Sequence, residues 1–165
     1  SEKLKSTNRD NIIGIQSQIW SETIRNENIL DYMFMPNIIV FSQKAWSKDP
    51  KWMSIQDQTE REITLNYEWN KFTNSIGQRV LPIVENIYGG LTYDLPKPGG
   101  IIKNDSLYAN TAFPGLNIKY TLDGSLPNIE SMNYNGPFEI DQDDVIYLRL
   151  FDNKGRGGYP IQVDK

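Results

Sequence analysis

The chain has 165 residues, a formal net charge of −4, and neither cysteine nor histidine. These absences exclude disulfides, thiolate chemistry, serine-histidine catalysis and imidazole metal ligands, so carboxylates are the candidate acid–base groups. The acidic balance argues against nucleic-acid binding, and no run approaches the roughly 20 apolar residues that span a bilayer. We expect no cofactor and no metal site, because the cluster of Asp141, Asp143 and Asp144 lacks the glycine and terminal glutamate of an EF-hand loop.

The first elements predict one β/α unit over residues 1–50. A run of β-branched residues from Ile12 to Ile19 predicts a buried strand. Pro36 suits the first turn of a helix, which we expect to continue to Trp46. Its buried face is expected to comprise Ile38, Ile39, Phe41, Ala45 and Trp46.

Residues 51–98 predict a helical connector. A helix is expected from Ser54 to Ile76, with capping boxes at Ser54–Asp57 and Thr59–Glu62 as alternatives. Apolar residues three or four apart predict its core-facing stripe, which consists of Leu65, Trp69, Phe72, Ile76 and Val80. Gly77 is expected to break this helix, and a shorter helix follows to Ile87.

A cluster of prolines and glycines at residues 95–100 predicts a boundary, after which β-type patterns take over. Strands are expected at Ile118–Leu122, Val145–Phe151 and Gly158–Val163, with turns at Asp123-Gly124 and Asn153–Gly155. Alternation in the second strand points Ile146, Leu148 and Leu150 inward and Arg149 outward. Residues 99–165 therefore predict a small antiparallel sandwich, and the whole chain is of the α+β class.

Two motifs in the first part carry a resemblance. The run Gly14-Ile-Gln-Ser-Gln-Ile-Trp20-Ser-Glu22 resembles the last barrel strand of family 20 glycoside hydrolases, and Phe41-Ser-Gln-Lys-Ala-Trp46-Ser47 is similar to their final barrel helix. The residues Ser42-Gln43-Lys44 depart from the family's usual Ala-Glu-Arg at one turn of that helix.

Two further motifs follow in the family's order. Trp69-Asn-Lys-Phe72 and Tyr93-Asp-Leu-Pro96 resemble the connector of chitobiase-like members, and the segment from Ala109 to Pro127 resembles their immunoglobulin-like C-terminal domain. The resemblance covers about residues 10–165. It implies the last strand and helix of a (β/α)8 barrel at 1–50, connector helices at 51–98 and an immunoglobulin-like sandwich at 99–165.

The resemblance also implies an activity for a longer parent protein. Such enzymes are exo-acting, retaining β-N-acetylhexosaminidases in which the acetamido group of the substrate is the nucleophile, assisted by an adjacent Asp-Glu pair. No Asp-Glu dipeptide occurs in this chain, so it holds no catalytic residue and is expected to be inactive alone. Trp20 matches the tryptophan that forms an apolar wall around the terminal sugar in the family. Glu22 matches the carboxylate that accepts hydrogen bonds from the hydroxyls of that sugar. A core tryptophan and a solvated loop charge are the alternative interpretation.

Partners follow from the same resemblance. The parent is expected to act on glycans with terminal N-acetylhexosamine, and the family suggests a periplasmic or secreted location. Two other hypotheses for the β part remain open: a carbohydrate-binding module that uses Tyr108, Tyr134 and Tyr159, or a protein-interaction domain. An unpaired strand and a bare helix face would also favour a homodimer through residues 10–47.

Overall fold

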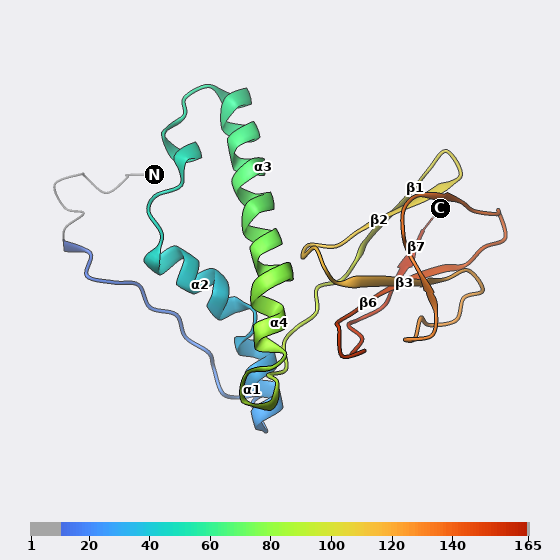
Figure 1. The fold of residues 1–165 in the computed structure, drawn as a ribbon, viewed down its shortest axis with the longest axis horizontal. Coiled ribbons are helices and arrows are strands. Elements are labelled where there is room, and N and C mark those ends of the chain that lie inside the picture. The colour runs from blue at the N-terminus through green and yellow to red at the C-terminus, as the bar shows by residue number, and fades with distance from the viewer. Residues whose placement is uncertain (1–10, 165) are drawn as a thin grey trace.

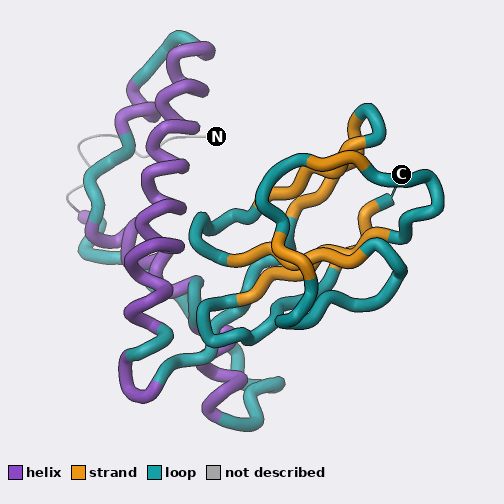
Figure 2. Tube along the Cα trace, turned by 45° about the vertical axis from the view of Figure 1, so that its right-hand side comes forward, coloured by secondary structure: helices purple, strands orange, loops and turns teal. Residues whose placement is uncertain are grey.

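The computed structural model describes residues 11–164 and divides them into a helical part and a β part. Figure 1 shows the long helix α3 standing between the N-terminal segments and the strands, and Figure 2 shows helices and strands gathered on opposite sides. No helix among the described residues is long and apolar enough to cross a membrane. The four tryptophans, at 20, 46, 52 and 69, all precede the β part.

The predicted buried strand at Ile12–Ile19 is wrong for this chain. These residues have no regular secondary structure and every one of them is exposed; the side chain of Ile13 is 101% exposed and that of Ile12 is 59% exposed. A run of β-branched residues forms a strand only where neighbouring strands supply hydrogen-bond partners. Within residues 11–164 no strand lies beside it, so the segment runs extended along the helical part (Figure 1).

Two short helices follow. The first, α1 (Glu27–Phe34), was not predicted; the side chain of Asn26 caps it by accepting a hydrogen bond from the Ile29 amide at 3.0 Å. The predicted helix after Pro36 is confirmed as α2 (Asn37–Trp46). Its expected buried face is wrong at the C-terminal end, where Ala45 and Trp46 are exposed, because no other described element covers that turn.

The next segment contains η2 (Lys51–Ser54) and the 18-residue helix α3 (Gln58–Ser75). Neither predicted capping box forms, because Asp57 is the N-cap and its carboxylate accepts from the Glu60 amide at 2.8 Å. The predicted stripe is correct only at its C-terminal end. Ile76 is buried and Phe72 packs against the core, whereas Leu65 and Trp69 are 40% and 56% exposed.

The predicted break at Gly77 takes the form of a change in helix type, since α3 ends at Ser75. The helix continues through a π turn, η3 (Ile76–Val80), into α4 (Leu81–Val84), before η4 (Ile87–Gly89). Gly77 is needed for another reason: a Cβ atom there would lie 2.0 Å from the carbonyl oxygen of Pro114. The glycine lets the backbone of the loop at 113–115 touch the helix directly.

Within the described residues the strands form two antiparallel sheets. The first has the order β1-β2-β5 and contains β1 (Gly99–Lys103), β2 (Ser106–Asn110) and β5 (Phe138–Glu139). The second has the order β4-β3-β6-β7 and contains β3 (Asn117–Thr121), β4 (Met132–Asn133), β6 (Ile146–Phe151) and β7 (Ile161–Val163). β1 packs closely on the second sheet, because a Cβ at Gly100 would meet Leu148 and Val163 at 2.7 Å.

The core lies between these sheets and continues into the helical part. The predicted inward residues of β6 are confirmed, since Ile146, Leu148 and Leu150 are at most 1% exposed while Arg149 points to the other face. The hairpin of β6 and β7 is confirmed by its register, in which Ile146 faces Val163. Buried Ile76, Leu81 and Val84 of the helical part belong to the same cluster, so the two parts share one core.

Candidate functional site

Trp20 and Glu22, the predicted sugar-binding residues, lie in the exposed N-terminal segment. The Trp20 side chain is 70% exposed and that of Glu22 is also exposed. A backbone hydrogen bond from Ile24 to the Ser21 carbonyl, 3.1 Å long, turns the chain just after them. Neither residue lines either of the two pockets described below. Their role stays a prediction.

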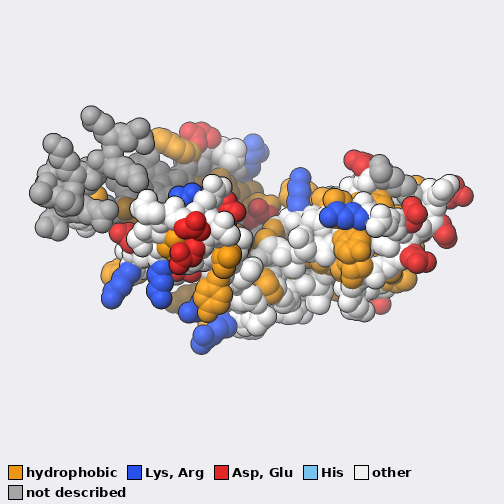
Figure 3. All heavy atoms as spheres, turned by 90° about the horizontal axis from the view of Figure 1, so that it is seen from above, with side chains coloured by type: hydrophobic (Ala, Val, Ile, Leu, Met, Phe, Trp, Pro, Cys, Tyr) orange, Lys and Arg blue, Asp and Glu red, His pale blue; other side chains and the backbone are white. Residues whose placement is uncertain are grey.

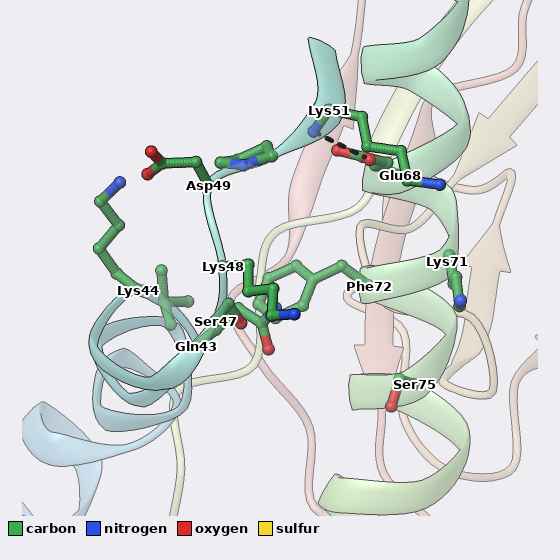
Figure 4. Close-up of a pocket in the computed structure, with 12 residues that line it drawn as sticks. Gln43, Lys44, Ser47, Lys48, Asp49, Lys51, Glu68, Lys71, Phe72 and Ser75 are labelled. Atoms are coloured by element: carbon green, nitrogen blue, oxygen red, sulfur yellow. Dashed lines mark hydrogen bonds between the residues drawn. The ribbon is translucent and has the colours of Figure 1, made fainter. Parts of the chain in front are cut away.

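A pocket of about 610 Å³ lies between α2, the connection after it and α3 (Figure 4). Phe72 provides an apolar wall, and the amide of Lys51 donates to Glu68 across its rim at 3.4 Å. Four lysines surround it, namely Lys44, Lys48, Lys51 and Lys71. Their side chains extend in different directions in Figure 4, so their positive charges do not converge on one anion. The pocket is a gap between helices rather than a built site.

A second pocket, of about 310 Å³, lies where α1, the linker at 92–95 and the β part meet. It is lined by Tyr32, Thr92, Tyr93, Asp94, Leu95, Arg149, Arg156, Gly157, Gly158, Tyr159 and Pro160. Hydrogen bonding to the Asp94 carboxylate, followed by burial, raises the pKa of Tyr32 to about 12. The Asp94 amide donates to the Met35 carbonyl at 3.2 Å, which ties the linker to the end of α1.

Beneath this pocket a polar network joins the helical and β parts. The Tyr93 hydroxyl donates to Glu85 Oε1 at 2.7 Å, and the carboxylate also accepts from Asn153 at 3.4 Å. Burial, followed by the hydrogen bond to Glu85, raises the pKa of Tyr93. Lys154 donates to the Glu85 carbonyl. Both Glu85 and Tyr93 are at most 5% exposed, so the network holds the junction from inside.

Asp152 and Arg156 complete the network. Asp152 is 4% exposed and forms an ion pair with Arg156 Nε at 2.9 Å. The same guanidinium donates to the Tyr93 carbonyl at 2.7 Å and lies over the Tyr93 ring, 4.4 Å from its centroid. Only a turn at 153–155 was predicted here from the sequence. The network was not predictable, because Tyr93 and Arg156 are 63 residues apart and no local pattern links them.

The acidic residues form no metal centre in the part of the chain that the structure describes: no group of three or more His, Cys, Asp or Glu residues is placed to hold a metal ion. In the predicted acidic cluster, the Asp144 carboxylate instead accepts from the Asp141 amide at 2.8 Å. Acidic side chains gather at the end of the β part away from the helices (Figure 3).

Comparison with known proteins gives two family matches. Residues 1–49 match the glycosyl hydrolase family 20 catalytic domain, and residues 85–158 match the chitobiase/beta-hexosaminidase C-terminal domain. The chain belongs to glycosyl hydrolase family 20. The family 20 catalytic match ends just after α2 and contains Trp20 and Glu22, while the C-terminal match begins at Glu85 in the buried network and ends at Gly158 in the second pocket.

Two bacterial relatives support the family 20 assignment. The chain is 34% identical over 120 residues to N,N'-diacetylchitobiase of Vibrio harveyi, an alignment that covers 67% of this chain and 13% of that protein. It is 32% identical over 167 residues to beta-hexosaminidase of Vibrio vulnificus, which covers 92% of this chain and 19% of that protein. The chain therefore spans less than a fifth of the length of these relatives.

Proposed function

We propose that the chain is the C-terminal piece of an exo-acting, retaining β-N-acetylhexosaminidase that releases terminal β-linked N-acetylglucosamine or N-acetylgalactosamine. The observation that carries the proposal is the position of the motif with Trp20 and Glu22 inside the match to the catalytic domain, with the C-terminal domain following in the same chain. The names of the two relatives support the same substrate class.

The exposed N-terminal segment fits this proposal. In the whole enzyme, residues 12–19 would form the last strand of a (β/α)8 barrel and pair with strands on both sides, and α2 would be the helix that follows. In the present chain these residues are unpaired and exposed, as expected for a barrel strand without its neighbours. Residues 51–98 would then connect the barrel to an immunoglobulin-like domain at 99–165.

Each of the two residues would have a distinct role in the whole enzyme. Trp20 would pack against the apolar face of the terminal sugar, and Glu22 would accept hydrogen bonds from its outer hydroxyls. Hydrolysis would be substrate-assisted, with the acetamido oxygen of the substrate attacking the anomeric carbon. In an Asp-Glu pair elsewhere in the parent, the Asp would orient the acetamido group and the Glu would be the general acid and base. No such pair occurs in this chain, which we therefore expect to be inactive alone. A periplasmic or secreted location belongs to the same proposal.

The test uses the full-length parent with the substitution Glu22→Gln. The amide keeps the shape of the side chain but removes the charge that strengthens hydrogen bonds to sugar hydroxyls, so kcat/KM for an aryl N-acetyl-β-glucosaminide should fall about tenfold to a hundredfold. The matched control is Glu130→Gln, since Glu130 is an exposed carboxylate of the β part.

The isolated 165-residue chain should show no turnover of the same substrate above buffer. Turnover by a preparation free of host hexosaminidase would overturn the proposal for the chain. Equal kinetics of the parent and its Glu22→Gln variant would overturn the role of Glu22, and a loss in both glutamine variants would point to a change in stability rather than in the sugar site.

A further inference from the structure

The second pocket presents aromatic rings from two distant parts of the chain. Tyr32 comes from α1 and is half-buried, whereas Tyr159 precedes β7 and is 63% exposed. Arg156 lines the same pocket, so the three side chains border one space. An exposed ring beside a recess is a common way to hold a ligand that has an apolar face.

The wall opposite α1 is rigid. The Arg149 guanidinium donates to the carbonyls of Gly158 at 2.7 Å, Gly157 at 3.4 Å and Pro127 at 3.3 Å. Gly157 allows this approach, because a Cβ there would lie 2.6 Å from Arg149 Nε. Gly158 allows the loop to lie against the linker, because a Cβ there would lie 2.9 Å from the Leu95 Cβ. The loop that carries Tyr159 is therefore held in place before any ligand arrives, which lowers the entropic cost of binding.

The polar groups that line the pocket include a carboxylate, Asp94, and a guanidinium, Arg156. Asp94 lines the pocket beside Tyr32, and its carboxylate is an acceptor with several lone pairs to offer. Arg156 donates to Asp152 and to the Tyr93 carbonyl, and a guanidinium carries more N–H donors than these two bonds use. A ligand with several hydroxyl groups would meet both kinds of partner.

We propose that this pocket binds a pyranose sugar, with the ring face on Tyr159 and hydroxyls at Asp94 and Arg156. A pyranose has an apolar face and a polar rim, which matches an aromatic ring flanked by a carboxylate and a guanidinium. The volume of about 310 Å³ is at the small end of ligand pockets, as suits one or two sugar rings. The site is separate from Trp20 and Glu22 and does not require the chain to take part in hydrolysis.

The test is isothermal titration of the 165-residue chain with N,N'-diacetylchitobiose and with cellobiose. We expect saturable binding of at least one sugar. Tyr159→Ala should weaken it about tenfold, as for the loss of a contact worth about 1.4 kcal/mol, and Tyr159→Phe should retain it because the ring remains. Tyr67→Ala is the matched control, because Tyr67 is 68% exposed on α3 and does not line the pocket.

The proposal would be overturned if neither sugar bound to the wild-type chain, if the wild type and Tyr159→Ala bound equally, or if Tyr67→Ala lost as much binding as Tyr159→Ala. Binding of inorganic phosphate without binding of sugar would also overturn the proposal, because it would show that the arginines of the pocket bind an anion. Thermal unfolding of each variant separates the loss of a contact from the loss of the fold. Because the titration involves no turnover, its outcome is independent of the hydrolase proposal.

Discussion

Asp152 is the residue on which the junction between the helical and β parts depends most directly. One of its carboxylate oxygens accepts from the amides of Lys154 at 3.0 Å and Arg156 at 2.8 Å, and the other accepts from Arg156 Nε at 2.9 Å. The carboxylate thus shapes the turn and orients the guanidinium that covers Tyr93. Removing one buried acceptor leaves several donors without a partner, which is more destabilising than the loss of an exposed ion pair.

We predict that Asp152→Asn lowers the free energy of unfolding by about 1–3 kcal/mol, because the amide nitrogen would place a donor against the Arg156 donor. Urea unfolding at neutral pH measures the change. Asp143→Asn, at an exposed position in the β part, should leave the free energy of unfolding within about 0.5 kcal/mol of the wild type. Equal midpoints for the Asp152 variant and the wild type would show that the ion pair contributes little.

At the scale of elements, the contact between η3 and the loop at 113–115 joins the connector to the β part. Replacing a helical glycine by alanine normally stabilises a helix by up to about 1 kcal/mol. At Gly77 the new Cβ would overlap the Pro114 carbonyl, which is backbone and cannot rotate away. The steric effect therefore outweighs the helix propensity, and alanine at this position is expected to destabilise the protein.

Gly77→Ala should lower the free energy of unfolding by about 1–3 kcal/mol, the range for overpacking a close contact. Gly14→Ala serves as the control, because nothing lies within 4 Å of a Cβ placed there. Denaturant unfolding followed by circular dichroism gives both values. A Gly77→Ala variant more stable than the wild type would mean that the loop at 113–115 moves aside without loss.

The elements also show what the sequence could predict. The alternation in β6 is strong because its two faces differ in burial, and the inward side of the strand was predictable residue by residue. The run at Ile12–Ile19 has the composition of a buried strand, but composition cannot supply the strands that must pair with it. The prediction that Leu65 and Trp69 of α3 are buried was wrong for the same reason, because periodicity identifies an apolar face but not the element that covers it.

For the site, the motif led to the prediction of Trp20 and Glu22, whose role stays a prediction. The second pocket and the network beneath it were not predictable, since they combine Tyr32, Tyr93 and residues near 156 that only the fold brings together. Composition indicated carboxylates as candidate acid–base groups and tyrosines as candidate sugar-binding residues. It did not distinguish Tyr159, which lines a pocket, from Tyr134. The hydroxyl of Tyr134 accepts from the Ala109 amide at 2.9 Å, and its ring packs against the core.

At the scale of the whole molecule, apolar groups are exposed along the N-terminal region. The exposed side chains in the described part of this region include Ile12, Ile13, Ile15, Trp20, Val40 and Trp46. Burial stabilises by roughly 25 cal/mol per Å² of apolar surface, so covering a few hundred Å² would favour association. We expect a symmetric dimer through residues 10–47, of which residue 10 lies outside the described residues.

Sedimentation velocity at micromolar concentration tests this expectation. The chain should sediment as a dimer or as a concentration-dependent mixture, and deletion of residues 1–50 should give a monomer. A chain that is strictly monomeric with or without these residues would show that the exposed apolar groups do not drive association.

Because of the uneven distribution of the tryptophans, the intrinsic tryptophan fluorescence of the protein comes from one of its two parts. Since positions 20, 46, 52 and 69 all precede the β part, indole emission reports on the helical part alone, whereas far-ultraviolet ellipticity near the β-sheet band includes both parts. Recording the two signals during one denaturant titration compares the parts without any added dye. Coincident curves mean that the shared core makes them one cooperative unit, and separated curves mean that the junction opens before the sheets do.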